Sequence, residues 1–440
     1  MKNFLLLLAL FIPATIAFID VMAVSVGFRP IMQDFHASLS QTQWLLSAYT
    51  IGTAAFLMVI GRLSDLYGRK VFLMYGLIVF FLASLAGMLA DSMGVLIASR
   101  FFQGVGGAVM LTTTTSIMMH HFPKEQRASI LSRWAAFMAF GMAAGPFLGG
   151  VLIHFISWRA IFGFNLPVSI LSLLLTWKLV PESKDNNPSL KIHVGEVVLL
   201  SLCLLSVVSA LSEGQAYGWT SLSILSLFAI TCGAGLALFK MEKSLKNPLV
   251  DFSFFHLQNF TRASLCGFLS YFCIYAWLFI FNIYLQSGYG LTPMQTGSLL
   301  IVYPLAAGVA AQTISLIIGR HIRGEIIMRL GFCTGCVAFI AMSTVTPHTS
   351  IISLALMFSL LGATISMVNA PSIALATYFV PPHKTGSASG LIFSIRWLGG
   401  SLGVALMTLV YQAFDKLSVV CIILAGVALL GVGCLAFRRE

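Results

Sequence analysis

Two opposite charges stand inside long apolar segments of the sequence. Asp20 lies in the apolar run 4–27, and Arg100 lies in the run 94–118. If both runs cross a membrane as helices, the two residues lie ~9 Å from the same end, at about 1.5 Å per residue. Ionisable residues inside a membrane are costly and usually functional. An Asp20–Arg100 ion pair, direct or through Gln103 or water, would give a carboxylate that gains and loses a proton. The alternative is a static ion pair that only holds two helices together.

A third charge inside an apolar run, Arg396, has no acidic residue of its own nearby in the sequence. It could bind an anionic group of a substrate, or it could cap backbone carbonyls, and the sequence favours neither. Aromatic residues crowd the run 263–286, Tyr271 and Tyr275 among them, while Trp44 and Tyr49 lie in the run 43–63. Such rings could line an apolar, adaptable pocket. For any single ring, packing between helices is the simpler interpretation.

Nothing in the sequence predicts a metal site or a cofactor. Cys333 and Cys336 form a C-x-x-C pair, but no second cysteine pair or histidine lies nearby to complete a zinc site. No G-x-x-x-x-G-K-[ST] loop for a nucleotide is present. The apolar runs also lack a clustered nucleophile, an acid pair or a set of metal ligands. These observations disfavour an ATP-driven pump and a membrane-embedded enzyme.

The composition determines which elements must position these residues. The chain has 440 residues, of which 58% are hydrophobic and 9% are charged. A soluble domain is roughly 25% charged, so this chain must use lipid as its main solvent. Long unbroken apolar runs, at about 20 residues per span, indicate helices rather than barrel strands. We predict an all-α membrane protein with fourteen spans: 4–27, 43–63, 71–90, 94–118, 128–153, 160–180, 194–211, 222–239, 263–286, 297–318, 326–345, 350–376, 388–412 and 418–437.

The basic residues predict the orientation of these spans. Most of the 25 lysines and arginines fall in or beside the loops on one side of the predicted membrane. The other side holds only Arg29, Arg100, Arg159 and Lys416. Because cytoplasmic loops are enriched in Lys and Arg, we expect both termini in the cytoplasm and Gly218 outside. This placement explains the net charge of +11 without nucleic acid as a partner.

Three glycine-rich motifs have spacings that indicate close packing or tight turns. The first is the loop string Gly61-Arg-Leu-Ser-Asp65-Leu-Tyr-Gly68-Arg69-Lys70. The second, in the run 94–118, is Arg100-Phe-Phe-Gln103-Gly104-Val-Gly-Gly107. The third, in the run 128–153, places Gly141, Gly145 and Gly149 on one helix face, with Pro146 and Gly150 beside them. Such a glycine face lets another backbone approach closely, and Pro146 removes one helical hydrogen bond.

These strings resemble motifs A, B and C of the major facilitator superfamily, in that order. The match to motif A covers Gly61, Leu63, Asp65, Gly68, Arg69 and Lys70, and the third string resembles the antiporter signature, motif C. Ile19-Asp20, Trp158-Arg159, Asn165-Leu-Pro167, Glu213-Gly-Gln-x-x-Gly218-Trp219 and Arg396-Trp-Leu-Gly-Gly400 resemble the fourteen-span drug:proton antiporter branch. The resemblance runs nearly from end to end.

Three positions depart from the family pattern. Ser132 stands where motif C often has a glycine, and Arg29 stands where an apolar residue is usual. The counterpart of motif A in the second half, Gly319-Arg-His-Ile-Arg323, has Arg323 where an aspartate could lie. The resemblance therefore implies that the cytoplasmic latch is carried by the first half, at Gly61, Asp65, Gly68, Arg69 and Lys70.

The resemblance implies two six-helix halves, residues 1–180 and 256–440, with an inserted helix pair in 181–255. A faint internal repeat agrees, since Arg133-Trp134 and Arg396-Trp397 begin equivalent helices. We expect a monomeric proton-coupled exporter of small apolar or amphipathic compounds in the inner membrane, working by alternating access with protons, lipid and a small-molecule substrate as its partners. A transporter specific for one metabolite such as a siderophore is the first alternative. A membrane enzyme or receptor is the second.

Overall fold

The computed structural model describes residues 2–183, 194–245, 252–317, 324–378, 380 and 385–436. Within these residues the chain is helical, and no strand occurs. The helices are α1 (Lys2–Val26), α2 (Phe28–Asp34), α3 (Leu39–Tyr67), α4 (Arg69–Met88), α5 (Met93–His121), α6 (Lys124–Phe155), α7 (Arg159–Leu179), α8 (Val194–Tyr217), α9 (Leu222–Ser244), η1 (Phe252–His256), α10 (Gln258–Ser287), α11 (Pro293–Leu300), α12 (Val302–Ile317), α13 (Gly324–Met342), α14 (Ile351–Tyr378), α15 (Thr385–Phe414) and α16 (Leu417–Ala436).

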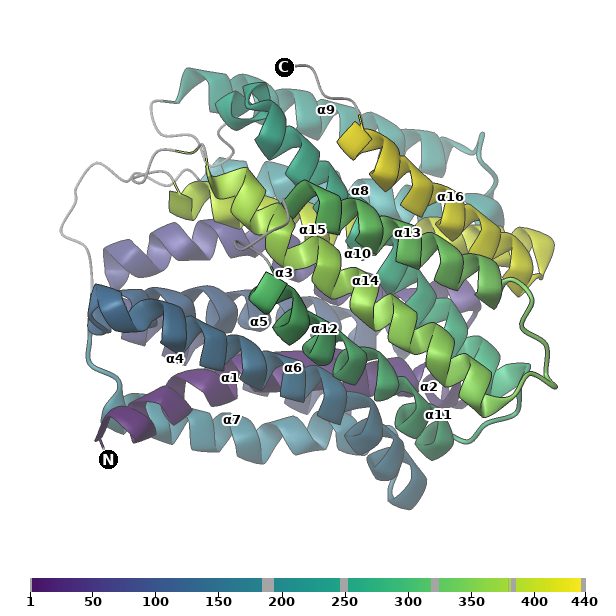
Figure 1. Ribbon diagram of the computed structural model, residues 1–440, viewed down its shortest axis with the longest axis horizontal. Helices are drawn as coiled ribbons and strands as arrows, with labels where there is room; N and C mark the ends of the chain where they lie inside the picture. Colours follow the sequence, from purple (N-terminus) through teal and green to yellow (C-terminus); the bar gives the residue numbers. More distant parts are fainter. Residues whose placement is uncertain are drawn as a thin grey trace.

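The predicted all-helical membrane architecture is confirmed. In the described residues, thirteen helical segments are long and apolar enough to cross a membrane. The remaining predicted span corresponds to α3, which has 29 residues and is apolar beyond its polar start at Ser40, Gln41, Thr42 and Gln43, but whose side chains are only partly described. The helices run roughly parallel, with the N-terminus at one end of the bundle and α2 and α11 at the other (Figure 1). We call the latter the α2 end.

Two details differ from the predicted spans. A short helix, α2, follows α1 after Gly27. Pro30 lies in the first turn of α2, where its missing N–H is tolerated. The predicted span 297–318 is divided at Ile301 into α11 and α12. Pro304 explains this division, since it has no N–H to donate to the carbonyl of Leu300.

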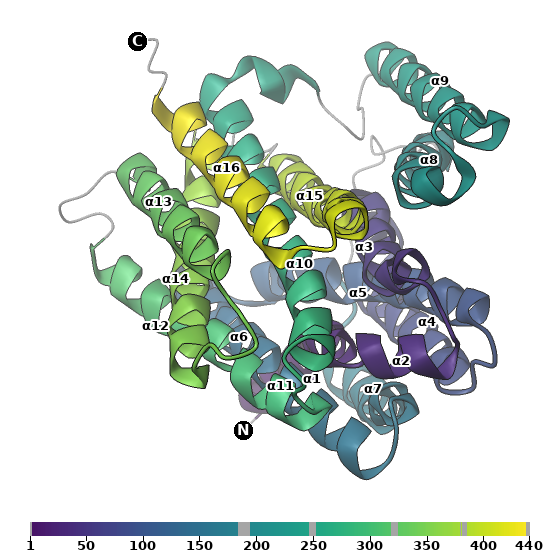
Figure 2. The same ribbon diagram turned by 90° about the vertical axis from the view of Figure 1, so that its right-hand side faces the viewer.

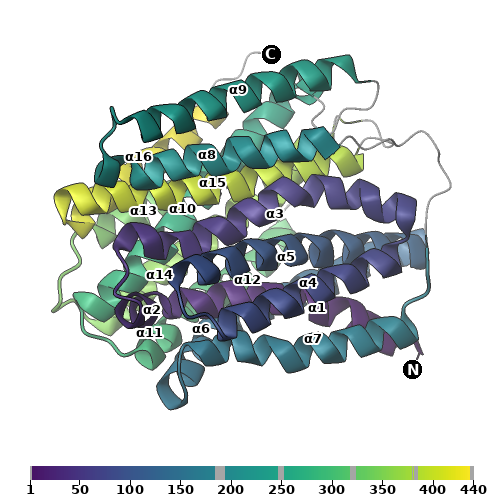
Figure 3. The same ribbon diagram turned by 180° about the vertical axis from the view of Figure 1, so that it is seen from behind.

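The helices form two groups with a helix pair beside them. The first half contains α1 and α3–α7, and the second half contains α10–α16. The halves meet chiefly where α3 packs on α15 and where α6 packs on α11. The pair α8–α9 lies outside both, against α3 and α15 (Figures 2 and 3). The Gln43 side chain of α3 donates a hydrogen bond to Ser212 of α8. The predicted domain boundaries at 181 and 256 stay predictions.

The fifth helix of each half packs on the first helix through glycines. A Cβ at Gly145 of α6 would lie 2.8 Å from the carbonyl oxygen of Ile19 in α1. A Cβ at Gly149 would lie 2.8 Å from the Cα of Ala23. In the second half, a Cβ at Gly403 of α15 would lie 2.8 Å from the Cα of Phe272 in α10. The equivalent packing of α1 with α6 and of α10 with α15 supports the internal repeat.

The two halves are joined at the α2 end by polar and aromatic contacts. Arg29 of α2 donates a hydrogen bond to the carbonyl oxygen of Gln286 in α10. The Gln286 amide in turn donates to the carbonyl oxygen of Val26, at 2.9 Å. The rings of Phe28 and Phe279 pack with their centroids 5.0 Å apart. All hydrogen bonds between the halves that join described residues lie at this end.

A separate cluster fixes α2 to the first half. The Asp34 carboxylate accepts hydrogen bonds from Trp158 Nε1 at 3.0 Å and from Arg159 Nη1 at 2.8 Å. These two donors hold the pKa of Asp34 below its ordinary value of 3.8. The contact is therefore complete above that pH and is lost only as the pH falls below it.

Substitution of Gly145 tests the packing of α6 on α1. In Gly145→Ala the new methyl group meets the backbone of α1, so we expect a loss of about 1–3 kcal/mol of unfolding free energy. The matched control is Gly233→Ala in α9, where a Cβ meets nothing within 4 Å. Because Ala favours helix over Gly, the control should keep or slightly raise the Tm of the purified protein. Equal Tm values for the two variants would contradict the packing.

Candidate functional site

Asp20 lies in the interior of the first half, where its carboxylate accepts three hydrogen bonds. The donors are Arg100 Nη1 to Oδ2, Gln103 Nε2 to Oδ1 at 3.2 Å, and Asn165 Nδ2 to Oδ1 at 2.6 Å. Only 1% of Asp20 is exposed. The structure therefore brings together the three predicted residues Asp20, Arg100 and Gln103, and adds Asn165 from α7.

The guanidinium of Arg100 is held on several sides. Its Nε donates to the carbonyl oxygen of Leu45 at 2.9 Å, and its Nη1 also donates to Gln103 Oε1 at 2.7 Å. The group lies over the ring of Tyr49, 4.6 Å from the ring centre. Its Nη2 has no hydrogen-bond partner among the described residues. Arg100 thus connects α1, α3 and α5 around one buried charge pair.

Ser84 of α4 completes this polar centre. Its hydroxyl accepts from Gln103 at 2.9 Å and from Asn165 at 3.4 Å, and donates to the carbonyl oxygen of Phe80 at 2.7 Å. Sequence reasoning gave no role to Ser84 or Asn165. An amide inside the apolar run 160–180 was a signal for Asn165, since a buried amide needs polar partners. A serine can satisfy itself on its own helix, so Ser84 gave no such signal.

These contacts can hold the ionised Asp20 carboxylate away from water, because the charge of Arg100 balances it. A buried ion pair is expensive to break, because each partner left alone is an uncompensated charge. Uptake of a proton by Asp20 would neutralise the carboxylate and leave Arg100 without its anion. The network would then have to rearrange. A coupling role and a static role both fit these contacts, so proton coupling at Asp20, Arg100 and Gln103 stays a prediction.

Aromatic rings connect this centre to the second half. Tyr49, which lies beside Arg100, also packs against Trp397 of α15, with ring centroids 6.2 Å apart. Trp397 contacts Tyr271 at 5.9 Å and Tyr275 at 5.5 Å, both on α10. Four of the five predicted cavity residues, Tyr49, Tyr271, Tyr275 and Arg396, thus lie on or next to Trp397.

The fifth predicted cavity residue, Trp44, lies elsewhere. It is partly buried against the apolar core and makes no ring contact with the Trp397 group. The helix that carries Tyr271 and Tyr275, α10, is the central helix of the second half, and most of its aromatic side chains are buried. Packing between helices is therefore the role of most of these rings, as the sequence indicated.

The motif A loop is attached to the end of α7. Gly68 has a φ of +116°, and a Cβ there would lie 2.9 Å from Glu182 Oε1. The backbone N–H of Arg69 donates to the carbonyl oxygen of Ser183 at 2.9 Å, and that of Lys70 to Glu182 Oε1 at 3.1 Å. Lys70 Nζ donates to the carbonyl oxygen of Trp177 at 2.7 Å. These contacts join the start of α4 to the last turn of α7 and to the two residues 182–183 that follow it.

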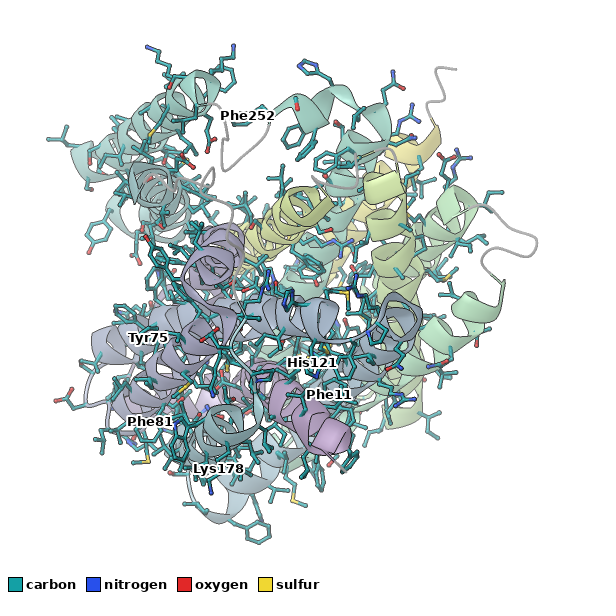
Figure 4. All side chains as sticks on the ribbon, turned by 90° about the vertical axis from the view of Figure 1, so that its left-hand side faces the viewer. Phe11, Tyr75, Phe81, His121, Lys178 and Phe252 are labelled. Atoms are coloured by element: carbon teal, nitrogen blue, oxygen red, sulfur yellow. The ribbon has the colours of Figure 1, made fainter. Side chains whose placement is uncertain are left out.

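The loop lies at the end of the bundle that Figure 4 faces, where His121 and Lys178 end α5 and α7. A Cβ at Gly61 would meet nothing within 4 Å. The side chains of Asp65 and Arg62 lie outside the described residues, as does the predicted counterpart at 319–323. The conformational latch therefore stays a prediction.

Motif C also reaches the second half. A Cβ at Gly150 would lie 2.8 Å from the Cα of Met294 in α11, and one at Gly297 would lie 2.8 Å from the Pro146 carbonyl carbon. Residues Gly141 to Gly150 therefore press α6 against α1 on one side and against α11 on the other. The helix continues through Pro146 from Lys124 to Phe155. A role of this segment in antiport stays a prediction.

Two buried carboxylates were missed by sequence reasoning. Glu196 at the start of α8 and Glu242 near the end of α9 are 2% and 3% exposed. Both lie at the same end of the inserted pair, where α8 begins and α9 ends. In the described residues, no group of three or more His, Cys, Asp or Glu side chains is arranged to hold a metal ion.

Comparison with known proteins places the chain in a family. The model of the Major Facilitator Superfamily matches residues 10–404. The chain therefore belongs to this superfamily of multi-pass membrane transporters, and the predicted family is confirmed. A bacterial homologue of the human lysosomal transporter Spinster, solved in an inward-facing and occupied conformation, has the same fold. The TM-score is 0.70 at 16% identity, over 98% of this chain and 95% of that one.

Several curated relatives match nearly the whole chain. The methylenomycin A resistance protein of Streptomyces coelicolor is 29% identical over 96% of this chain and 89% of its own length. The multidrug resistance protein Stp of Mycobacterium tuberculosis is 29% identical over 90% of this chain and 74% of its own. The riboflavin transporter RibZ of Clostridioides difficile is 24% identical, over 92% and 87%.

A double-mutant cycle tests the contact between Asn165 and Asp20. Asn165→Ala removes a donor to a charged group, so we expect a cost of about 1.5–3 kcal/mol of unfolding free energy. The matched control is Ser169→Ala, one turn further along α7, because the Ser169 hydroxyl has no hydrogen-bond partner in the part of the chain that the structure describes. In an Asp20→Asn background the effect of Asn165→Ala should fall by more than half. Additive effects in that background would show that Asn165 does not stabilise the Asp20 carboxylate.

Proposed function

We propose that the chain exports small apolar or amphipathic compounds in exchange for protons by alternating access. One observation carries this proposal: a single aromatic ring, that of Tyr49, separates the buried Asp20–Arg100 pair from Trp397 of the second half. Tyr49 touches both the Arg100 guanidinium and Trp397. A change of charge at Asp20 therefore has a short physical route to the packing of the second half.

The proposed cycle starts from the arrangement in which the halves are joined at the α2 end. The basic residues support an outward-facing α2 end and cytoplasmic termini, in an inner membrane. A proton that reaches Asp20 releases Arg100 from its anion, and the polar centre rearranges. The halves then separate at the α2 end and close at the opposite end of the bundle. Loss of the proton from Asp20 restores the Asp20–Arg100 ion pair. Protons, one small-molecule substrate and the lipid bilayer are the partners, no cofactor takes part, and one chain suffices.

The names of the relatives support export of toxic compounds, but they differ in breadth. One names a single antibiotic, and another names multidrug resistance. The riboflavin transporter supports the alternative that the chain moves one metabolite. Drug susceptibility of a host without its own pumps separates these two functions. A broad exporter protects against several unrelated compounds, whereas a metabolite transporter protects against none or one.

The central test replaces Asp20 by Asn, which keeps the size of the side chain and cannot titrate. In proteoliposomes, Asp20→Asn should abolish uphill efflux driven by a pH gradient, because the amide cannot take up the proton, and should preserve substrate binding. The matched control is Asp91→Asn, because Asp91 is an exposed carboxylate in the loop before α5. It should pump like the wild-type protein.

Two results would overturn this assignment. If Asp20→Asn still pumps uphill, the proton is carried elsewhere and Asp20 is structural. If the variant loses binding together with pumping, while its Tm is unchanged, Asp20 contacts the substrate directly. Binding is therefore measured on the same preparation as efflux.

A further inference from the structure

A second buried guanidinium, Arg396, lies in the second half without an anion. The residue is 1% exposed and sits within α15. Its Nη2 donates to Ser372 Oγ at 2.6 Å and to the carbonyl oxygen of Asn369 at 3.1 Å, both on α14. Its Nε has no hydrogen-bond partner among the described residues. No carboxylate contacts Arg396 in the part of the chain that the structure describes.

The comparison with Arg100 shows why this is unusual. Both guanidinium groups are removed from solvent, but Arg100 is neutralised by Asp20. Arg396 has only neutral acceptors, which leave most of its charge uncompensated. A lone buried charge is costly in the membrane interior, and natural proteins rarely keep one without a role. A bound anion would offset this cost whenever it is present.

Gly267 of α10 packs directly against the Arg396 side chain, because a Cβ at that position would lie only 2.7 Å from the Nε atom and 2.9 Å from Cγ. The rings of Tyr271 and Phe393 lie 5.9 and 5.4 Å from the guanidinium carbon. Both rings are only partly buried, so they form the more exposed side of the Arg396 surroundings.

The neighbouring residue supplies an apolar wall. Trp397 contacts Tyr271 and Tyr275, which stack on each other with centroids 5.5 Å apart. Trp397 also reaches Tyr49 of the first half. A cation beside adjoining aromatic faces matches a molecule with a flat apolar body and one acidic group. A static role as a cap for α14 would use the same Nη2 bonds, but it would leave the charge of the guanidinium without a counter-ion.

We propose that Arg396 binds the anionic group of an amphipathic substrate whose apolar body lies against Trp397, Tyr271 and Tyr275. This inference rests on the proposed function, because it requires that the chain binds a small molecule between its halves. It defines the substrate class: aromatic or apolar compounds that carry a carboxylate or another ionised acidic group. The charge of the bound anion compensates Arg396 only while the substrate is bound.

The test is equilibrium binding of two matched probes to the purified full-length protein in nanodiscs. Pyrenebutyrate carries a carboxylate, and pyrenebutanol has the same apolar body without the charge. Empty nanodiscs give the background of each probe. A charge-assisted hydrogen bond in a dry site should make the wild-type protein bind pyrenebutyrate at least about tenfold more tightly than pyrenebutanol.

Two substitutions assign the preference to Arg396. Arg396→Gln should remove the preference for pyrenebutyrate and leave the Kd of pyrenebutanol nearly unchanged. Arg396→Lys keeps the charge and should retain part of the preference. The matched control is Arg133→Gln on α6, since Arg133 is exposed and loses the same charge far from the rings. The Tm of each variant shows whether it is folded. The comparison of the two probes on the wild-type protein does not depend on the folding of any variant.

Two results would overturn the proposal. One is equal binding of both probes by the wild-type protein, and the other is an unchanged preference in folded Arg396→Gln. The assay uses no proton gradient, so it is independent of the coupling at Asp20. A preference for the anion together with failed proton-driven efflux would support this site and contradict the proposed coupling. Proton-driven efflux by a protein that binds both probes equally would support the proposed coupling and contradict this site.

Discussion

The charge pair of Asp20 and Arg100 is the interaction on which the first half of the bundle depends. Neither side chain has access to water, so each requires the other, together with Gln103, Asn165 and Ser84. These residues come from four helices, and the carbonyl oxygen of Leu45 adds a fifth. A buried pair of this kind contributes little net stability, because desolvation offsets most of the attraction. In the proposed function, a single proton taken up by Asp20 changes the charge balance of this pair.

The remaining structure connects this pair to the contacts between the halves. Glycines of α6 bring α1 close on one face and α11 close on the other, so α6 joins the charged centre to the contact between the halves. Tyr49 and Trp397 form a second connection in the middle of the bundle. Arg29, Gln286 and the rings of Phe28 and Phe279 close the α2 end. The second half has its own buried cation, Arg396, for which the described residues supply no carboxylate partner.

Much of this architecture could be predicted from the sequence, because lipid imposes a simple rule on span length and charge. The predicted spans agree with the helices to within a few residues, and Asp20 and Arg100 could be paired from their equal depth. Asn165 and Ser84 were missed, since which polar residues meet depends on helix rotation, which apolar sequences barely specify. The contacts of the motif A loop with Glu182 and Ser183 were missed for a related reason. They join segments far apart in the chain.

The central claim is that the charge state of Asp20 controls how the halves are arranged, and a distance measurement across the α2 end tests it most directly. Spin labels at the exposed residues Gln41 of α3 and Ser287 of α10 lie on opposite halves. With the eight native cysteines replaced, pulsed electron spin resonance gives the distance distribution between these labels in nanodiscs. The account predicts two populations whose ratio changes with pH in the otherwise native protein and is independent of pH in Asp20→Asn. An unchanged pH response in Asp20→Asn would contradict it.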